Sequence, residues 1–375
     1  MSSDTPLLDF DDWDRDIFCM LGLPFDAESM QSAVDKIRLS VTAKRKVFLT
    51  TPNLNFVVGS LHDVALRQSV INSNMVVVDG MPLVLVARLL GLPIMERVAG
   101  ASLFEQLSQP ASSLAKLKVF FFGGMQGVAK RAHDTVNKFS LGMSSIGYLD
   151  PGFKSVEEMS IPAYITKINQ AAPDFLVVAL GAQKGQQWID KNFQSLSVPV
   201  VSHLGAVINF SAGTVSRAPK FIQKLGLEWL WRIKEEPYLW RRYYKDGLHF
   251  LRLIAFNVLP IAIYNHFKYY SINNSSKGLM TLSLPETGGA LLILSGNFHG
   301  SLADYNRQTM KNAFQKNMDV MIDFTHADFL GAGLIAYLLI LQQKLKRQNR
   351  RLILLKLSAM HKRLLKWHCV NYLLD

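Results

Sequence analysis

The sequence of 375 residues has only two cysteines, Cys19 and Cys369, which lie near its two ends. It contains no CxxC pair and no cluster of cysteine with histidine, so neither a disulfide framework nor a zinc site is expected. The nine histidines are scattered, and their spacing predicts no other metal site. This use of cysteine fits a protein of the reducing cytoplasm.

Acidic residues are also scarce: the chain has 29 Asp and Glu against 41 Lys and Arg, which gives a formal net charge of +12. The excess predicts an anionic partner, and charge alone leaves open a nucleic acid, an anionic lipid surface or a phosphorylated substrate. Charged residues make up 19% of the chain and apolar residues 49%. This composition excludes intrinsic disorder, because burial of so much apolar surface offsets the conformational entropy of the chain.

Long apolar runs are missing as well. The best candidate, Leu253–Phe267, has fifteen residues and contains Asn257, Pro260 and Asn265, whereas a membrane span needs about 20 apolar residues. We therefore expect this run to lie on a membrane and not to cross it. The first sixteen residues carry six aspartates and one arginine, the opposite of a secretory signal. We expect this terminus to be flexible.

What the chain does have is an alternation of short β-branched runs with longer helical patterns from residue 47 onward. This alternation predicts a Rossmann-like α/β fold with a mostly parallel sheet. Several runs are continuously apolar, as in strands whose two faces are covered by helices. The predicted strands are 47–51, 75–78, 118–122, 144–148, 175–180 and 198–201.

Composition divides the chain into five parts. After the α/β core, tryptophans and tyrosines alternate with lysines and arginines, which indicates basic, aromatic helices. A polar, turn-rich stretch follows, and strand and helix patterns then begin again. The predicted parts are an N-terminal segment (1–39), the α/β core (40–216), a basic helical appendage (217–268), a linker (269–278) and a smaller α/β domain (279–375).

Polar residues follow two of the predicted strands. Thr51 and Asn53 end the first strand, and Asp79 ends the second. Because ligands of parallel sheets bind outside the carboxyl ends of the strands, these side chains are expected to face one crevice. Asp79 is either the N-cap of a helix beginning near Pro82 or a general base in that crevice, and both interpretations stay open here.

Five further positions are candidates for phosphate binding. Gly123 and Gly124 follow a strand and allow close approach of a ligand to a helix N-terminus. Gly181 and Lys184 form a similar loop with an added cation. Arg97 follows a helix and is either a phosphate ligand or a solvated surface arginine. No GxGxxG, GxxxxGK[ST] or GxSxG motif is present.

Five motifs follow one another along the chain: TPN (51–53), VVVDG (76–80), ERVAG (96–100), FFFGG (120–124) and RAPKFIQKLGLEWLWR (217–232). In this order they resemble the WecG/TagA/CpsF glycosyltransferases. The resemblance covers about residues 40–250 and implies an inverting, metal-independent transfer without a cofactor. A sugar would pass from a UDP-sugar to a polyprenyl-diphosphate-linked saccharide on the cytoplasmic face of the membrane, in bacterial surface or exopolysaccharide assembly.

The resemblance also implies roles for single residues. Asp79 matches the aspartate proposed as general base, which would deprotonate the acceptor hydroxyl. The appendage arginines Arg232 and Arg242 match residues that close over the site and contact diphosphate. Residues of the pocket around donor and acceptor are matched by Thr51, Asn53 and Arg97.

This chain departs from the family pattern in the loop that usually reads G-x-P-K-Q-E. Residues 181–186 read GAQKGQ, so Gly185 replaces the glutamine and Gln186 the glutamate. Ser102 stands where an acidic residue is usual, and Leu239 where an arginine is usual. For this reason we do not assume the N-acetylmannosamine or N-acetylmannosaminuronate donors of the best-known members.

Residues 278–375 resemble a STAS domain, on the stretches 320–334 (VMIDFTHADFLGAGL) and 350–357 (RRLILLKL). Phosphorylatable members have D-S-x-G at the start of a helix, but here 330–333 read LGAG. Without a hydroxyl to phosphorylate, we expect passive docking of a protein partner. An alternative function follows: a non-catalytic scaffold of a polysaccharide assembly complex, in which the altered loop has lost donor binding.

The positive charge is concentrated in two segments, 217–252 with a net +5 and 344–366 with +9. A solvated helix face is one explanation of such runs. We favour an anionic membrane surface, because the basic residues of the appendage stand beside tryptophans. Nucleic acid is not expected as a partner, since the chain has no recognised nucleic-acid-binding module.

Overall fold

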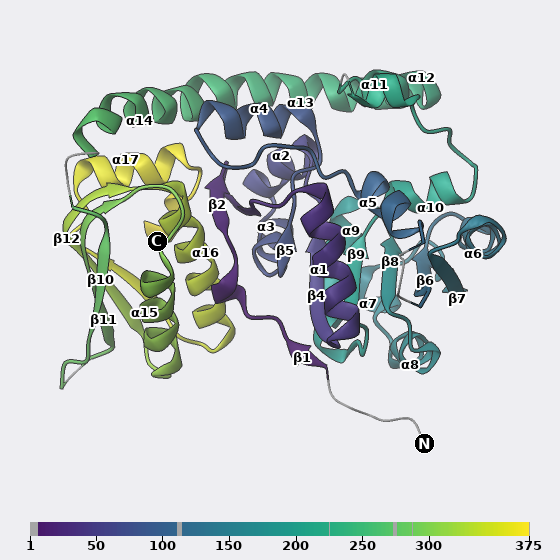
Figure 1. Ribbon diagram of the computed structural model, residues 1–375, viewed down its shortest axis with the longest axis horizontal. Coiled ribbons are helices and arrows are strands. Elements are labelled where there is room, and N and C mark those ends of the chain that lie inside the picture. The colour runs from purple at the N-terminus through teal and green to yellow at the C-terminus, as the bar shows by residue number, and fades with distance from the viewer. Residues whose placement is uncertain (1–6, 111–114, 225, 273–275, 287, 375) are drawn as a thin grey trace.

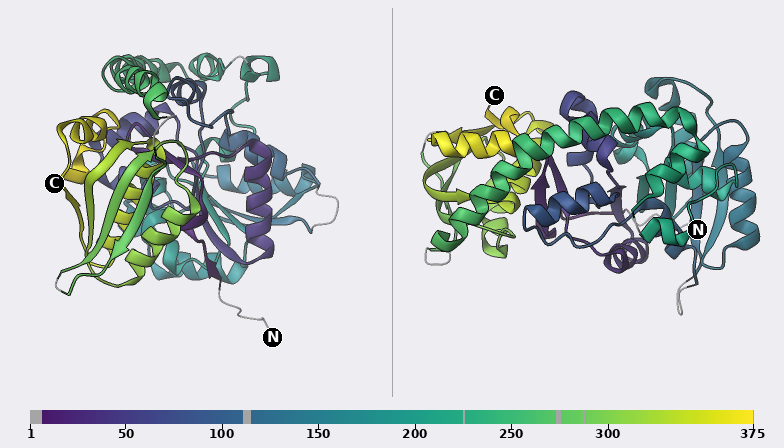
Figure 2. Two further views of the ribbon diagram at one scale, coloured as in Figure 1. Left: turned by 60° about the vertical axis from the view of Figure 1, so that its left-hand side comes forward. Right: turned by 90° about the horizontal axis from the view of Figure 1, so that it is seen from above.

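The computed structural model describes residues 7–110, 115–224, 226–272, 276–286 and 288–374. Two α/β bodies lie side by side, and one long helix crosses above both of them (Figures 1 and 2). The larger body holds a parallel sheet with helices on both faces. The smaller body holds the C-terminal strands and helices.

The larger sheet has seven strands, all paired in parallel, which confirms the predicted Rossmann-like class. Its order is β1-β4-β9-β8-β6-β7, with β5 also beside β4. Strand β8 is buried along its whole length, as expected for a strand covered on both faces. The strands are β1 (Leu8–Asp9), β4 (Arg45–Thr50), β5 (Met75–Val76), β6 (Leu117–Gly123), β7 (Met143–Leu149), β8 (Phe175–Ala179) and β9 (Val200–His203).

Ten helices connect and cover these strands. Each pairs an apolar face with the sheet or with a neighbouring helix. The helices are α1 (Met30–Thr42), α2 (Leu54–His62), α3 (Val64–Ile71), α4 (Met81–Leu89), α5 (Gly100–Leu107), α6 (Val128–Phe139), α7 (Val156–Met159), α8 (Pro162–Ala171), α9 (Ala182–Asn192) and α10 (Gly205–Ser211).

The acidic N-terminal segment is part of the fold, so the expectation of a flexible terminus is wrong for its described residues. It forms a short turn (Asp12–Asp14) and an antiparallel hairpin of β2 (Ile17–Met20) and β3 (Leu23–Asp26). Its aspartates have cationic partners in the C-terminal domain: Asp11 pairs with Lys311 at 2.6 Å, and Asp12 with Lys344 at 2.6 Å. The negative terminus thus complements the positive domain.

The C-terminal domain contains a four-stranded sheet in the order β10-β11-β12-β13, antiparallel only between β10 and β11. Its central helix is buried on nearly all sides, because the domain's own sheet packs on one side and the β2-β3 hairpin on another. Trp13, Ile17 and Cys19 therefore belong to the core of this domain. The elements are β10 (Leu279–Ser283), β11 (Ala290–Phe298), α15 (Asp304–Gln315), β12 (Val320–Leu330), α16 (Ala332–Arg347), β13 (Leu352–Leu355) and α17 (Ala359–Trp367).

The appendage forms α11 (Lys220–Lys224), α12 (Glu228–Glu235) and the long helix of Figure 1, made of α13 (Trp240–Leu253), a π-helical turn (Ile254–Val258) and α14 (Leu259–Ile272). The stretch Pro237–Lys268 is one continuous helical run, long and apolar enough to cross a membrane by length and composition. The expectation that the run is too short is therefore wrong. The reason is local: the π-helical turn shifts the hydrogen bonds by one residue just before Pro260, so the helix continues through the proline.

Candidate active site

A cavity of about 870 Å³ lies between the carboxyl ends of strands β4, β5 and β9 and the appendage. Its position agrees with the rule that ligands bind outside the carboxyl ends of parallel strands. Residues of helices α12 and α13 line the cavity on the side of the appendage. Six of the residues predicted for the site line it: Thr51, Asn53, Asp79, Arg97, Arg232 and Arg242.

Asp79 does not cap helix α4. The helix begins at Met81, its N-cap is Gly80, and no side chain caps it. The capping interpretation is thus wrong. The Asp79 backbone N–H donates to Pro52 O at 2.9 Å, and the carboxylate accepts a hydrogen bond from the Gly100 N–H at the start of α5. These two bonds hold the carboxylate in the wall of the cavity.

The surroundings of Asp79 give it an unusual acidity. Burial raises its pKa to about 6, and the negative charge of Glu228 acts in the same direction. Arg97, Arg217 and the Gly100 N–H stabilise the ionised form and limit the rise. A carboxylate with a pKa near 6 is ionised at pH 7 yet basic enough to take a proton, as a general base requires.

Thr51 and Asn53 lie at the end of β4, on the same side as Asp79. Thr51 is buried against Gly100, where an added Cβ would lie 3.2 Å from Thr51 Oγ1 and 2.5 Å from Leu204 Cδ2. Asn53 caps helix α2, accepting a hydrogen bond from the Phe56 N–H at 3.2 Å. Asn53 therefore has a structural role in addition to its place on the cavity.

Arg97 is not a solvated surface arginine, so that interpretation is wrong. Only 14% of its side chain is exposed, and it pairs with Glu228 of α12 at 2.6 Å. Arg217 lies on the other side of Glu228 at 3.9 Å and donates to Ser102 Oγ at 2.5 Å. It also pairs with Glu105 at 2.5 Å. Glu105, one helical turn after Ser102, thus gives Arg217 the carboxylate partner that a serine at position 102 does not provide.

The two appendage arginines line the cavity on the side opposite Asp79's strand. Arg232 pairs with Glu236 at 2.9 Å, and its buried Nε has no hydrogen-bond partner in the part of the chain that the structure describes. Arg242 is exposed on the cavity and lies over the Tyr243 ring at 5.1 Å. Both guanidinium groups present N–H donors suited to phosphate oxygens.

Two carboxylates that line the cavity, Glu228 and Asp246, were not predicted as site residues. Asp246 of α13 is buried and accepts a hydrogen bond from Asn55 Nδ2 at 3.1 Å, which ties the appendage to α2. Burial raises the pKa of Asp246. A signal was present in the sequence, because Asp246 is the single acidic residue of an otherwise basic helix. Among the described residues, no group of three or more His, Cys, Asp and Glu is placed to hold a metal ion.

Four predicted phosphate ligands do not line this cavity. The Gly124 N–H donates to Ala179 O at 2.7 Å, and a Cβ on Gly123 would lie 2.6 Å from the same oxygen. These glycines therefore allow β6 to pack closely against the end of β8. Lys184 Nζ donates to Lys154 O at 3.3 Å, and Gly181 precedes helix α9. Gly123, Gly124 and Lys184 thus have local packing or hydrogen-bonding roles, whereas Gly181 has open space where a Cβ would lie. We do not retain these four positions as residues of this cavity.

The profile of the glycosyl transferase WecG/TagA/CpsF family matches residues 18–261, about two thirds of the chain. This chain belongs to that family. The match includes the cavity and every strand of the parallel sheet except β1, and it ends inside α14 of the appendage. Membership confirms the resemblance of the motifs in 51–232, whereas the resemblance of residues 278–375 to a STAS domain stays a prediction.

Relatives of known name cover the same region. The chain is 28% identical to an N-acetylglucosaminyldiphosphoundecaprenol N-acetyl-beta-D-mannosaminyltransferase of Bacillus spizizenii, over 59% of this chain and 84% of the relative. It is 27% identical to the protein of that name from Bacillus subtilis, over 59% and 84%. The corresponding protein of Staphylococcus aureus is 24% identical, over 57% and 82%.

The two residues of loop 181–186 that differ from the family pattern, Gly185 and Gln186, each fit their surroundings in this structure. A Cβ on Gly185 would lie 2.1 Å from Cδ2 of His203, a residue that lines the cavity at the end of β9. The imidazole therefore occupies the space that a side chain at position 185 would need. Gln186 is fully buried, and its Nε2 donates to Thr50 Oγ1 at 2.6 Å. A neutral amide suits a buried position where no cation is described to pair with a carboxylate.

Replacing Gly185 by alanine is expected to destabilise the protein by about 1–3 kcal/mol, because the new methyl group overlaps with His203. In an uncrowded helix interior the same change would stabilise by about 1 kcal/mol. Urea unfolding of Gly185→Ala, His203→Ala and the double variant forms the test. In the His203→Ala background, alanine at 185 should become neutral or stabilising; a loss of stability as large as in the parent would contradict the fit.

Proposed function

We propose that this protein transfers a sugar from a UDP-sugar to a saccharide linked to polyprenyl diphosphate, with inversion and without a metal ion. The observation that carries the proposal is a carboxylate of raised pKa, Asp79, in the wall of a cavity whose other side bears Arg232 and Arg242. The names of the relatives, which describe sugar transfer to a diphosphoundecaprenol-linked sugar, support the acceptor class.

In the proposed reaction the acceptor hydroxyl attacks the anomeric carbon of the donor sugar, and its proton passes to the Asp79 carboxylate. The bond from the anomeric carbon to the UDP oxygen breaks in the same step, so the configuration inverts. Arg232 and Arg242 stabilise the charge that develops on the departing diphosphate. Arg97 is held by Glu228, which places its guanidinium at the cavity with its charge partly balanced.

The proposal is tested with purified protein, a panel of UDP-sugars and a short-chain polyprenyl-diphosphate saccharide. Release of UDP that requires both the acceptor and one particular donor is the expected result. The donor sugar is left to this panel, because Gly185, Gln186 and His203 change the wall next to the cavity. Failure of every UDP-sugar to react or to bind would instead support the alternative function, a non-catalytic scaffold of a polysaccharide assembly complex.

The architecture of the site favours an enzyme over a scaffold. The ionisable base Asp79 and the Arg97–Glu228 pair line one cavity that is large enough for substrates, which a scaffold does not require. The altered loop, residues 181–186, also does not block the cavity. Gly185 has no side chain, and the imidazole of His203 occupies the space that a side chain there would take.

The pH dependence of the reaction follows from the state of Asp79. The base must be ionised, and its pKa is about 6. We therefore expect kcat/KM to be level above about pH 7 and to fall tenfold for each pH unit below 6. A pH–rate profile with a constant concentration of ionised donor measures this, and an acid limb that breaks near pH 4 would show that Asp79 is not the base.

We further propose that the long helix lies along the cytoplasmic surface of an anionic membrane. One face of the helix is anchored: Asn257 Nδ2 donates to Trp367 O at 3.0 Å in the C-terminal domain, and Leu253 and Val258 are buried. The opposite side exposes apolar residues at helical spacing, flanked by exposed basic residues. The exposed apolar residues are Tyr244, Leu248, Leu251, Phe256, Leu259, Ile263 and Phe267.

Polar substitution on this side should weaken membrane binding selectively. The double change Phe256→Ser and Ile263→Ser removes two side chains that are 68% and 55% exposed. Binding to vesicles with anionic lipid is expected to fall about a hundredfold, since each of the two apolar side chains lost from the bilayer interface costs about 1.5 kcal/mol. The matched control is Phe139→Ser with Leu141→Ser, at 68% and 65% exposure on another part of the surface; an equal loss there would contradict the assignment.

A further inference from the structure

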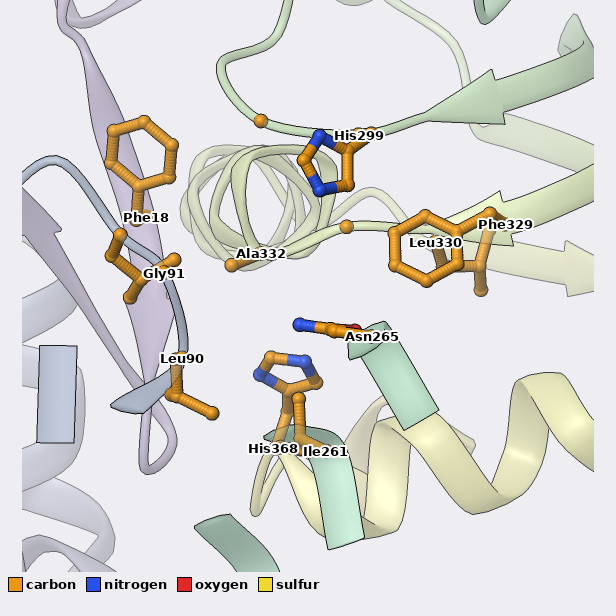
Figure 3. A pocket seen from close by; sticks show the side chains of 13 residues that line it. Phe18, Leu90, Gly91, Ile261, Asn265, His299, Phe329, Leu330, Ala332 and His368 are labelled. Carbon is orange, nitrogen blue, oxygen red and sulfur yellow. The ribbon is translucent and has the colours of Figure 1, made fainter. Parts of the chain in front are cut away.

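Two cavities of this protein differ in charge. The smaller one, of about 30 Å³, lies where the long helix meets the C-terminal domain, and no Asp, Glu, Lys or Arg is among its lining residues (Figure 3). The cavity of the proposed active site is lined by four arginines and three carboxylates. These residues are Asp79, Arg97, Arg217, Glu228, Arg232, Arg242 and Asp246. The way in which they pair decides which carboxylate is free to react.

Asp79 lies near two arginines but pairs with neither. Arg97 is the charged group with the strongest effect on the Asp79 carboxyl, and Arg217 also favours its ionised form. Yet no ion pair among the described residues includes Asp79. Both guanidinium groups lie near Glu228 instead, Arg97 at 2.6 Å and Arg217 at 3.9 Å. Within the part of the chain that the structure describes, the Asp79 carboxylate therefore has no direct cationic partner.

The carboxylate that engages both arginines comes from the appendage. Glu228 is the first residue of α12, and its side chain is 24% exposed, against 14% for Arg97. The pair is thus partly shielded from water, which makes it stronger than a pair on the surface. An acidic residue in the first turn also suits the helix dipole. The dipole does not account for the contact with Arg97, which stands 131 positions earlier in the chain.

The two arginines differ in the partners that they would have without Glu228. Arg217 keeps a second carboxylate, Glu105, at 2.5 Å. Arg97 has no other acidic partner among the described residues, so its guanidinium group would turn to Asp79, the carboxylate on which it already acts. An arginine paired directly with an aspartate lowers the pKa of the carboxyl group by about 1–3. A carboxylate of low pKa is a poor proton acceptor at neutral pH.

We propose that Glu228 is a positioning residue for the base. It holds the guanidinium group of Arg97 away from the Asp79 carboxylate, so that this carboxylate stays free to take the proton of the acceptor hydroxyl. The appendage then contributes a carboxylate that sets the strength of the base, in addition to the arginines that face the diphosphate. This inference rests on the proposed function, since a base is needed only for the transfer of a sugar.

The pH–rate profile of full-length Glu228→Gln tests the proposal. We expect the acid limb of kcat/KM, which breaks near pH 6 in the parent, to break at least one pH unit lower. At pH 7.5 kcat should fall about three- to tenfold, because the base is weaker. Glu228→Asp keeps the charge and should keep the break near pH 6. The matched control is Glu235→Gln, the same change at an exposed position of α12, which should leave the profile unchanged.

A titration of the Asp79 carboxyl group makes the test independent of turnover. The protein is labelled with ¹³C in its aspartate carboxyl groups, and the Asp79 signal is identified by its absence from the NMR spectrum of Asp79→Asn. We expect a midpoint near pH 6 in the parent and in Glu228→Asp, and a midpoint at least one pH unit lower in Glu228→Gln.

An unmoved midpoint and an unmoved acid limb in Glu228→Gln would overturn the proposal. Loss of activity with an unmoved limb would also overturn it, because Glu228 would then only hold the appendage in place. Equal shifts in Glu228→Asp and Glu228→Gln would likewise reject a role for the charge. If no UDP-sugar reacts but the midpoint moves as expected, the proposed transfer fails while the separation of Arg97 from Asp79 by Glu228 is supported.

Discussion

Replacing Asp79 by asparagine is expected to lower kcat by about 10²–10⁴-fold, the usual contribution of a general base. Asparagine keeps the size of the side chain and the oxygen that accepts from the Gly100 N–H, so the cavity should retain its shape. Binding of the UDP-sugar should change little, because the arginines that face the diphosphate are untouched. Steady-state kinetics, with donor binding measured by calorimetry, separates the two effects.

Asp246→Asn is the matched control for this variant. Asp246 is a second buried carboxylate of the same cavity, held by Asn55 and not by a strand end. Its amide can still meet Asn55, so we expect less than a tenfold loss in kcat. Full activity of Asp79→Asn, or equal losses in the two variants, would remove Asp79 from the role of base.

Arg15→Met is expected to destabilise the protein by about 3–5 kcal/mol, the cost of leaving a buried charge without its partner. Arg15 is 1% exposed, and its Nε and Nη2 donate to the two Asp26 oxygens at 3.0 and 2.7 Å. Its Nη1 donates to Ser73 O at 2.9 Å. Methionine fills much of the volume but leaves the Asp26 carboxylate without a cation. A shift of the urea midpoint measures the effect.

Exposed residues of the same segment should be far less sensitive. Asp14→Ala removes a charge one residue away in a side chain that faces solvent, and its effect should stay within about 0.5 kcal/mol. If Arg15→Met were equally mild, the N-terminal segment would not be an integral part of the folded structure. Because the segment contacts both bodies, we also expect the C-terminal domain to lose stability in Arg15→Met.

The sequence predicted the strands and the central part of the site for one physical reason. Strand β4 contains the apolar run 47–49 and β5 begins the apolar run 75–78, and a parallel sheet brings the residues after them to one edge. Thr51, Asn53 and Asp79 converge as that rule requires. The rule does not give the order of strands, and β9 and β8 separate β6 from β4. Gly123 and Gly124 therefore end away from the cavity although they also follow a strand.

Other features depend on contacts between distant parts of the chain, which local patterns do not contain. The aspartates of the first sixteen residues resemble a solvated tail until their partners, Lys311 and Lys344, are known. Asn257 interrupts an apolar run in the sequence, and in the structure it donates a hydrogen bond from the helix to Trp367 O of the C-terminal domain. In the same way the fit of Gly185 to His203 joins two segments that only the fold brings together.

The placement of Trp13 and Ile17 in the core of the C-terminal domain has a consequence for synthesis of the chain. Helix α16, against which the β2-β3 hairpin packs, leaves the ribosome more than three hundred residues after them. At about 5–20 residues per second this delay is roughly 15–60 s. During that interval the apolar side chains of Trp13 and Ile17 remain exposed. The ribosome meanwhile synthesises the strands of the parallel sheet, which lie between these residues and α16 in the sequence. The nascent chain therefore presents a natural substrate for chaperones until its last quarter has been translated.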